Sequence, residues 1–144
     1  MSDHAEILWA ERGIRRVVVR YAQGIDRRRW DVVRSCFTED AFIEGSRWSL
    51  PIDEYFPQLR AGVERYPSTM HFLGNQLVDV EAGHIETYAI AHHWCTEEPG
   101  APHPENLVLG VRYQDDVSRT DDGWRISRRS VSVDWRTGPY PPSA

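Results

Sequence analysis

The 144-residue chain contains no lysine, and all of its 17 basic residues are arginine. This bias indicates the codon usage of a GC-rich genome rather than selection for phosphate binding. The formal net charge is −5, which argues against nucleic acid as a partner. The run Arg27-Arg28-Arg29 does not change this, because three consecutive residues cannot share one helix face. We expect a solvated loop or helix start there.

Long apolar runs are missing as well. No segment approaches the roughly 18 residues that a membrane helix needs, so we expect no membrane association. Residues 1–6 are acidic where a secretion signal would be basic, and a cytoplasmic protein is expected. The only cysteines, Cys36 and Cys95, lack the spacing of a metal site, so we expect two reduced, buried thiols.

A chain of this length, with 40% hydrophobic residues and six tryptophans, predicts one globular domain over residues 1–144. There is no internal repeat and no low-complexity linker. Residues 1–4 and 138–144 are expected to be loose ends.

The first half of the chain has helical periodicity. Gly24 is expected to end the first helix in a left-handed conformation. Pro57 is expected to kink or delay the third helix. Between the second and third helices we expect a turn at 38–40 and a short strand at 41–44. The three helices are expected over residues 3–23, 29–36 and 52–66.

After Pro67 the apolar period changes from 3.6 to 2, which predicts strands joined by tight turns. Helices followed by consecutive antiparallel strands indicate an α+β fold. We expect a strongly curved antiparallel sheet wrapped around the N-terminal helices, a cone whose open end is a pocket. The strands are expected over residues 69–80, 84–96, 106–119 and 124–135.

Asp26 and His71 are the candidate catalytic residues. Asp26 follows the first helix between the apolar residues Ile25 and Trp30, so it is expected to face the core. His71 begins a strand-like run. A carboxylate and an imidazole in an apolar interior form an acid–base pair that needs no cofactor. The alternatives are a surface aspartate and a hydrogen-bonded core histidine.

Further residues are expected around this pair, mainly apolar and aromatic, to bind a small hydrophobic molecule. Asn75 shares a strand face with His71 and could supply a hydrogen bond. Tyr21 is either a donor to a substrate oxygen or a core residue, and Arg128 either holds an anionic group or lies on the surface. The remaining expected pocket residues are Phe42, Tyr55, Phe56, Phe72, Leu73 and Tyr113.

His92 and His93 are adjacent on a strand, so only one of them can enter the pocket, and the sequence leaves open which. A metal bound by Asp26, His71 and one of this pair is disfavoured, because no short-range ligand pair is present. We expect neither a metal nor a cofactor. Apolar residues on the sheet surface predict a homo-oligomer, a dimer or a trimer. They are Trp94, Val131, Val133 and Trp135.

Five motifs, in this order, resemble those of SnoaL-like proteins of the nuclear transport factor 2-like superfamily. The resemblance covers about residues 5–135. The motifs are Ile14-x6-Tyr21-Ala22-x3-Asp26-x3-Trp30-Asp31, Phe37-Thr38-x-Asp40-Ala41, Thr69-Met70-His71-Phe72-Leu73-Gly74-Asn75, Tyr113-x-Asp115 and Asp122-Gly123-Trp124-Arg125-Ile126.

The resemblance implies the cone fold with a deep apolar pocket and kinship with the scytalone dehydratase-like branch. In that branch an aspartate and a histidine act together at positions that match Asp26 and His71. The chain departs from scytalone dehydratase where that enzyme has two tyrosines and an asparagine. Ile25 stands at one of these positions, and Gly45 and Leu109 lie near the others, which puts the substrate in question.

Three functions fit these observations. The first is a cofactor-independent lyase or isomerase acting on a hydrophobic oxygenated ring compound, such as a polyketide, terpenoid or steroid. The second is a non-catalytic ligand-binding protein. The third is a small scaffolding subunit of a ring-hydroxylating oxygenase, which needs no Asp26–His71 pair.

Overall fold

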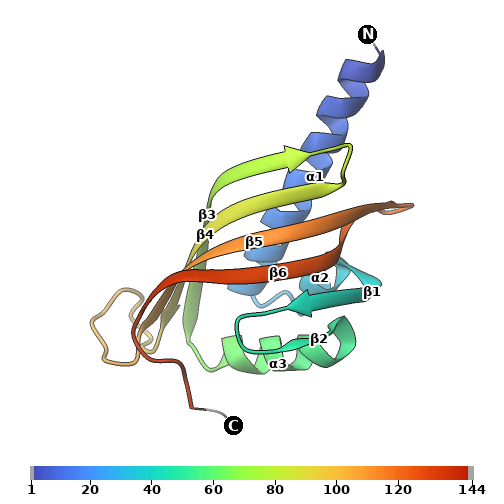
Figure 1. Cartoon of the computed structure of the whole chain (residues 1–144). Coiled ribbons are helices and arrows are strands. Elements are labelled where there is room, and N and C mark those ends of the chain that lie inside the picture. The colour runs from blue at the N-terminus through green and yellow to red at the C-terminus, as the bar shows by residue number, and fades with distance from the viewer. Residues whose placement is uncertain (1, 143–144) are drawn as a thin grey trace.

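In the computed structural model, which describes residues 2–142, a six-stranded sheet curves around three helices (Figure 1). The α+β class expected from the sequence is confirmed. The strand order is β2-β1-β6-β5-β4-β3. The elements are α1 (Ser2–Asp26), α2 (Trp30–Ser35), β1 (Phe37–Glu44), β2 (Ser49–Pro51), α3 (Ile52–Glu64), β3 (Ser68–Asp79), β4 (His84–Trp94), β5 (Leu107–Thr120) and β6 (Gly123–Thr137).

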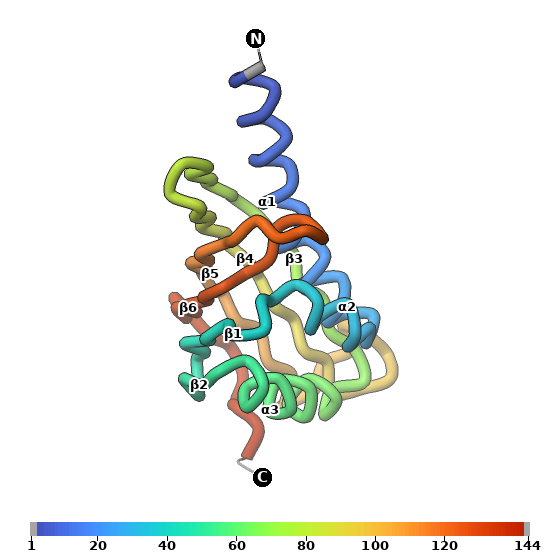
Figure 2. The backbone as a smooth tube through the Cα atoms, turned by 90° about the vertical axis from the view of Figure 1, so that its right-hand side faces the viewer, coloured from blue at the N-terminus to red at the C-terminus, as the bar shows by residue number. Residues whose placement is uncertain are grey.

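The sequence predicted an antiparallel sheet, but one pair of strands in the structure is parallel. Strands joined by short turns, β3 to β4 and β5 to β6, pair antiparallel, as do β4 with β5 and β1 with β2. β1 instead pairs parallel with β6, the last strand of the chain. This pair joins the N-terminal half of the fold to the long strands of the sheet. The helix α3 lies across the lower end of the cone (Figure 2).

The first helix does not end at Gly24 but continues to Asp26. Gly24 is buried, and a Cβ atom there would lie 2.8 Å from Cγ2 of Val33 in α2. Glycine is therefore required for helix packing rather than for helix termination. The helix ends through hydrogen bonds from Arg28 N–H to Ile25 O and from Arg29 N–H to Gly24 O, with Arg28 in the left-handed region at φ 55°.

One other local expectation was wrong. Residues 38–40 belong to β1 rather than to a turn, and the pairing of β1 with β6 is irregular between Phe37 and Phe42. Pro57 lies within α3, which begins at Ile52, so the helix does not start late at this proline. The short strand β2, which precedes α3, was missed in the sequence.

The core lies between the helices and the concave face of the sheet. It combines one face of α1 with inward side chains of the strands. Its fully buried members include Ile14, Val18, Ile25, Ile85 and Ile126. Burying this apolar area is the main driving force for the fold.

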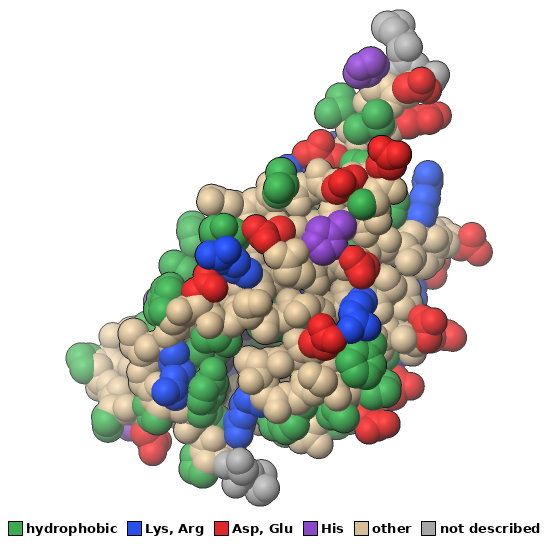
Figure 3. Space-filling view, viewed as in Figure 1, with side chains coloured by type: hydrophobic (Ala, Val, Ile, Leu, Met, Phe, Trp, Pro, Cys, Tyr) green, Lys and Arg blue, Asp and Glu red, His purple; other side chains and the backbone are tan. Residues whose placement is uncertain are grey.

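The opposite face of the sheet carries several exposed hydrophobic side chains. Figure 3 shows hydrophobic side chains along the left side of this face and charged groups scattered over the rest. Val131 and Val133 were expected on this exposed surface, but both are partly buried and pack against the core. The exposed side chains on the strands of this face are Met70, Phe72, Tyr88, Ile90 and Trp135.

The expected loose ends are also partly ordered. Residues 2–4 begin α1, and the segment after β6 turns back toward α3, where Pro142 O accepts a hydrogen bond from Arg65 Nη1 at 2.7 Å (Figure 1). Residues 1 and 143–144 lie outside the described residues. Within the described part of the chain, no helix is long and apolar enough to span a membrane.

Candidate active site

A pocket opens between α3, the concave face of the sheet and the C-terminal segment. Its volume is about 140 Å³. Most of its wall is apolar or aromatic, and His71 and His93 are the two imidazoles in it. The lining includes Tyr21, Trp48, Tyr55, Leu59, Val63, Tyr66, His71, His93, Leu109, Val111, Tyr113, Val131, Tyr140 and Pro141.

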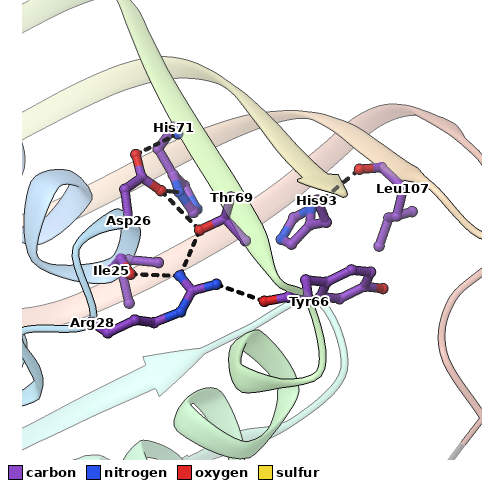
Figure 4. Close-up of polar contacts among 8 residues, drawn as sticks. All are labelled: Ile25, Asp26, Arg28, Tyr66, Thr69, His71, His93 and Leu107. Atoms are coloured by element: carbon purple, nitrogen blue, oxygen red, sulfur yellow. Dashed lines mark hydrogen bonds and ion pairs between the residues drawn. The ribbon is translucent and has the colours of Figure 1, made fainter. Parts of the chain in front are cut away.

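Asp26 and His71 are in contact, although 45 residues separate them in the chain (Figure 4). Asp26 Oδ1 lies 2.8 Å from His71 Nδ1, and Asp26 Oδ2 accepts a hydrogen bond from the His71 backbone N–H at 2.8 Å. The side chains are 7% exposed for His71 and 21% for Asp26. Asp26 therefore holds both the ring and the backbone of His71 from behind, while His71 itself lines the pocket.

The Asp26 carboxylate is held ionised by its neighbours. Burial alone would raise its pKa, but the hydrogen bonds and charge of His71, with the Thr69 hydroxyl, lower the pKa below its ordinary value. An ionised carboxylate only accepts hydrogen bonds, so the proton of a neutral His71 ring lies on Nδ1. Nε2 then keeps its lone pair, which is the arrangement of a general base.

Arg28 supports the pair from a strained backbone position. Its Nη1 donates to Thr69 Oγ1 at 2.7 Å and to Ile25 O at 2.8 Å, and its Nη2 donates to Tyr66 O at 2.8 Å. Thr69 in turn donates to Asp26 Oδ1 at 3.1 Å (Figure 4). These bonds offset the cost of the left-handed conformation. Arg28 is therefore not part of a solvated run, unlike the exposed Arg27 and Arg29.

His93, rather than His92, faces the pocket. Its ring centroid lies 6.0 Å from that of His71 and 4.9 Å from that of Tyr66. Its Nδ1 lies 3.2 Å from Leu107 O, which can only accept, so Nδ1 carries the proton. Burial, together with the nearby His71, lowers the pKa of His93 to about 4. His93 is therefore neutral near pH 7.

We expect acidification to destabilise the fold through His93. Its pKa falls from 6.5 to about 4 on folding, so between these values the unfolded chain binds more protons than the folded one. The free energy of unfolding should drop by on the order of 3 kcal/mol from pH 6.5 to pH 4. Urea unfolding across this range measures it. His93→Gln should weaken the pH dependence of the free energy of unfolding, and His92→Gln should not. An equal pH dependence in both variants would contradict the claim that His93 causes it.

Five tyrosines line the pocket, and three of them, Tyr21, Tyr55 and Tyr113, lie close to one another. Burial raises the pKa of Tyr21, Tyr55 and Tyr113 above the ordinary value. All three phenols therefore stay protonated at neutral pH and can donate a hydrogen bond to a ligand oxygen. The pocket thus combines one acid–base pair with neutral donors.

A buried ion pair beneath these tyrosines was missed in the sequence. Arg129 Nε and Nη2 each lie 2.7 Å from an oxygen of Asp115, and the two residues are 1% and 0% exposed. The guanidinium carbon lies 4.1 Å from the ring centre of Tyr21 and 4.2 Å from that of Tyr113. The Tyr113-x-Asp115 motif was the available signal, since alternate strand residues share a face.

Seven residues expected in the pocket lie elsewhere. Phe56 and Leu73 are partly buried and pack against the hydrophobic core. Phe72 is 66% exposed on the outer face of the sheet. Asn75 is exposed near it, because a β-bulge between Leu73 and Gln76 breaks the alternation. His92 stacks on Trp94 on that same face.

The other two misplaced residues lie on the surface near β1. Arg128 pairs with Glu44 and lies 5.5 Å from the ring of Phe42. In β6 the buried residue is Arg129 rather than Arg128, and in β1 it is Ile43 rather than Phe42.

Potential metal ligands gather at a different place. Within residues 2–142, the group of three is Cys95, His103 and Glu105, whose donor atoms lie within 4.8 Å of one another. Cys95 Sγ donates to Glu105 O, and Glu105 N–H donates to His103 Nδ1. These contacts organise the loop between β4 and β5. Both cysteines are free. Cys36 is buried as expected, but Cys95 is only partly buried, so the prediction that it is buried was wrong.

Comparison with known proteins gives the family and the fold. Residues 6–130 match the SnoaL-like domain family. An uncharacterised protein of Mycobacterium tuberculosis is 32% identical over 120 residues, 81% of this chain and 80% of that protein.

Solved structures agree with this match. A candidate scytalone dehydratase of Novosphingobium aromaticivorans has a TM-score of 0.79 at 23% identity, covering 100% of this chain and 95% of that one. A hexachlorocyclohexane dehydrochlorinase, LinA type 2, has a TM-score of 0.73 at 16% identity, covering 98% and 99%. At these identities the similarity shows a common fold.

Proposed function

Since the chain belongs to the SnoaL-like domain family, we propose that it is a cofactor-independent lyase or isomerase of the dehydratase type. The observation that carries the proposal is the Asp26–His71 contact at the wall of a mostly apolar pocket. The fold is shared with a dehydrochlorinase and a candidate scytalone dehydratase. Both names describe the loss of a small molecule from a ring or chain, which is the chemistry proposed here.

In the proposed reaction, His71 Nε2 removes a proton from the carbon beside a substrate carbonyl. The charge that develops on the carbonyl oxygen is stabilised by a phenol, Tyr21, Tyr55 or Tyr113. Asp26 stabilises the imidazolium that forms, through the bond to Nδ1. The imidazolium then returns the proton to a hydroxyl on the next carbon, the carbon–oxygen bond breaks and water leaves. In an isomerase the proton returns to another carbon instead.

The proposed substrate is a hydrophobic oxygenated ring compound, of the polyketide, terpenoid or steroid type. The lining holds hydroxyl groups, Gln58, the two imidazoles and one charged residue, Arg47, so it suits carbonyl and hydroxyl oxygens. The experiment is a panel of cyclic β-hydroxy ketones, beginning with 3-hydroxycyclohexanone, which loses water to give 2-cyclohexenone. Product masses lower by one water would support the proposal. Tight binding without turnover would favour a ligand-binding protein instead.

We also propose that the chain forms a homo-oligomer, a dimer or trimer, through the outer face of the sheet. That face exposes Met70, Phe72, Tyr88, Ile90 and Trp135, and monomers rarely leave such an apolar patch open. Sedimentation at micromolar concentration should give at least twice the chain mass, and Phe72→Glu should shift it toward the monomer. A monomeric wild type would contradict this.

A further inference from the structure

The segment that follows β6 forms one wall of the pocket. Gly138 turns the chain at φ 84°, and a Cβ atom there would lie 1.9 Å from Asn106 O, so only glycine fits. Beyond this turn the chain reaches the end of α3, near which Arg65 binds Pro142 O. Between these two points, Tyr140 and Pro141 line the pocket.

Tyr140 is held in this wall by two arginines. The guanidinium carbon of Arg136 lies 4.5 Å from its ring centre, and that of Arg47 lies 5.8 Å from it. Arg47 also lies 4.9 Å from the ring of Trp48, another residue of the lining. The ring of Tyr140 is thus fixed at the pocket between β6 and the loop before β2.

The volume of the pocket is small for the fused-ring ligands proposed above. It is about 140 Å³, whereas pockets for drug-sized ligands measure roughly 300–1,000 Å³. A cavity of about 150 Å³ in another protein holds a single benzene. With Tyr140 in place, the pocket therefore accommodates about one six-membered ring.

We propose that Tyr140 is a specificity-determining residue, which limits the ligand of this pocket to one ring and excludes fused rings. The proposal rests on the proposed function, because it concerns the same pocket. It narrows the substrate class to monocyclic oxygenated compounds. Fused-ring polyketides and steroids would then require the segment 138–142 to move aside.

The test compares the binding of phenol and 2-naphthol, one ring against two, by calorimetric titration. Wild type should bind phenol more tightly than 2-naphthol. Tyr140→Ala should raise the affinity for 2-naphthol relative to phenol at least about tenfold, because removing the ring enlarges the pocket. Tyr140→Phe keeps the ring and should behave as wild type. Trp9→Ala, an exposed aromatic residue on α1, is the matched control and should also change nothing.

A chain truncated after Thr137 provides a second variant, with folding checked by circular dichroism. It should show the same gain for 2-naphthol as Tyr140→Ala. The proposal would be overturned if the ratio of the affinities for 2-naphthol and phenol were unchanged in both Tyr140→Ala and the truncated chain. It would also be overturned if these variants lost affinity for both compounds equally, or if wild type bound neither compound. Failure of the proposed catalytic function is separate, because it would appear as unchanged turnover in His71 and Asp26 variants whatever these affinities are.

Discussion

Replacing His71 with alanine should lower turnover of the ring substrate by on the order of 100-fold or more, the usual contribution of a positioned acid–base group. The reason is that Nε2 of this ring is the candidate base, with Nδ1 bound to Asp26 at 2.8 Å. The bond from the residue 71 backbone N–H to Asp26 Oδ2 is kept in the variant. The fold should therefore persist while kcat falls.

Asp26→Asn should be nearly as harmful, since it keeps the shape of the side chain but loses the charge that stabilises the imidazolium. The matched control is His92→Ala, one residue from His93 but on the outer face of the sheet. It should leave kcat within about twofold of wild type. Full activity of folded His71→Ala and Asp26→Asn would show that the two residues are only a structural pair.

The largest expected effect on stability is at the buried pair of Arg129 and Asp115. Replacing Asp115 with asparagine, or Arg129 with methionine, leaves the other partner charged and uncompensated in the core. Breaking a buried pair in this way costs about 3–5 kcal/mol. Burial alone would lower the pKa of Arg129, but Asp115 raises it above its ordinary value, so the arginine stays charged. Urea unfolding of the two variants measures the loss.

The neighbouring residue provides the control for this pair. Arg128 binds Glu44, with side chains 50% and 40% exposed, so Arg128→Met should cost no more than about 1 kcal/mol. The double variant Arg129→Met with Asp115→Leu removes both charges and should recover much of the stability. The claim that the buried pair matters more would be contradicted if Arg129→Met and Asp115→Asn were as stable as Arg128→Met.

The sequence predicted the fold class, the main helices and the four long strands, because apolar periodicity reports directly which face is buried. It also predicted that Asp26 and His71 would meet. Asp26 is the last residue of an amphipathic helix and His71 lies near the start of the first long strand. Packing that helix on that strand brings the two residues together.

The individual pocket residues were harder to predict, because strand alternation depends on irregularities that the sequence does not mark. One bulge in β3 turns Asn75 outward, and register shifts in β5 and β6 accompany the inward orientation of Arg129 rather than Arg128. The parallel pairing of β1 was likewise invisible, since it depends on contacts distant in the chain. Arg28 was placed in a solvated run because nothing local reveals its three hydrogen bonds.

The most direct test of the proposed mechanism follows the proton itself. The ring ketone that wild type converts fastest is incubated in D2O, and deuterium at the carbon beside the carbonyl is measured by NMR. The account predicts rapid incorporation with wild type and with His92→Ala, and incorporation at the rate of buffer alone with His71→Ala. Incorporation at the wild-type rate by folded His71→Ala would contradict the claim that His71 moves this proton.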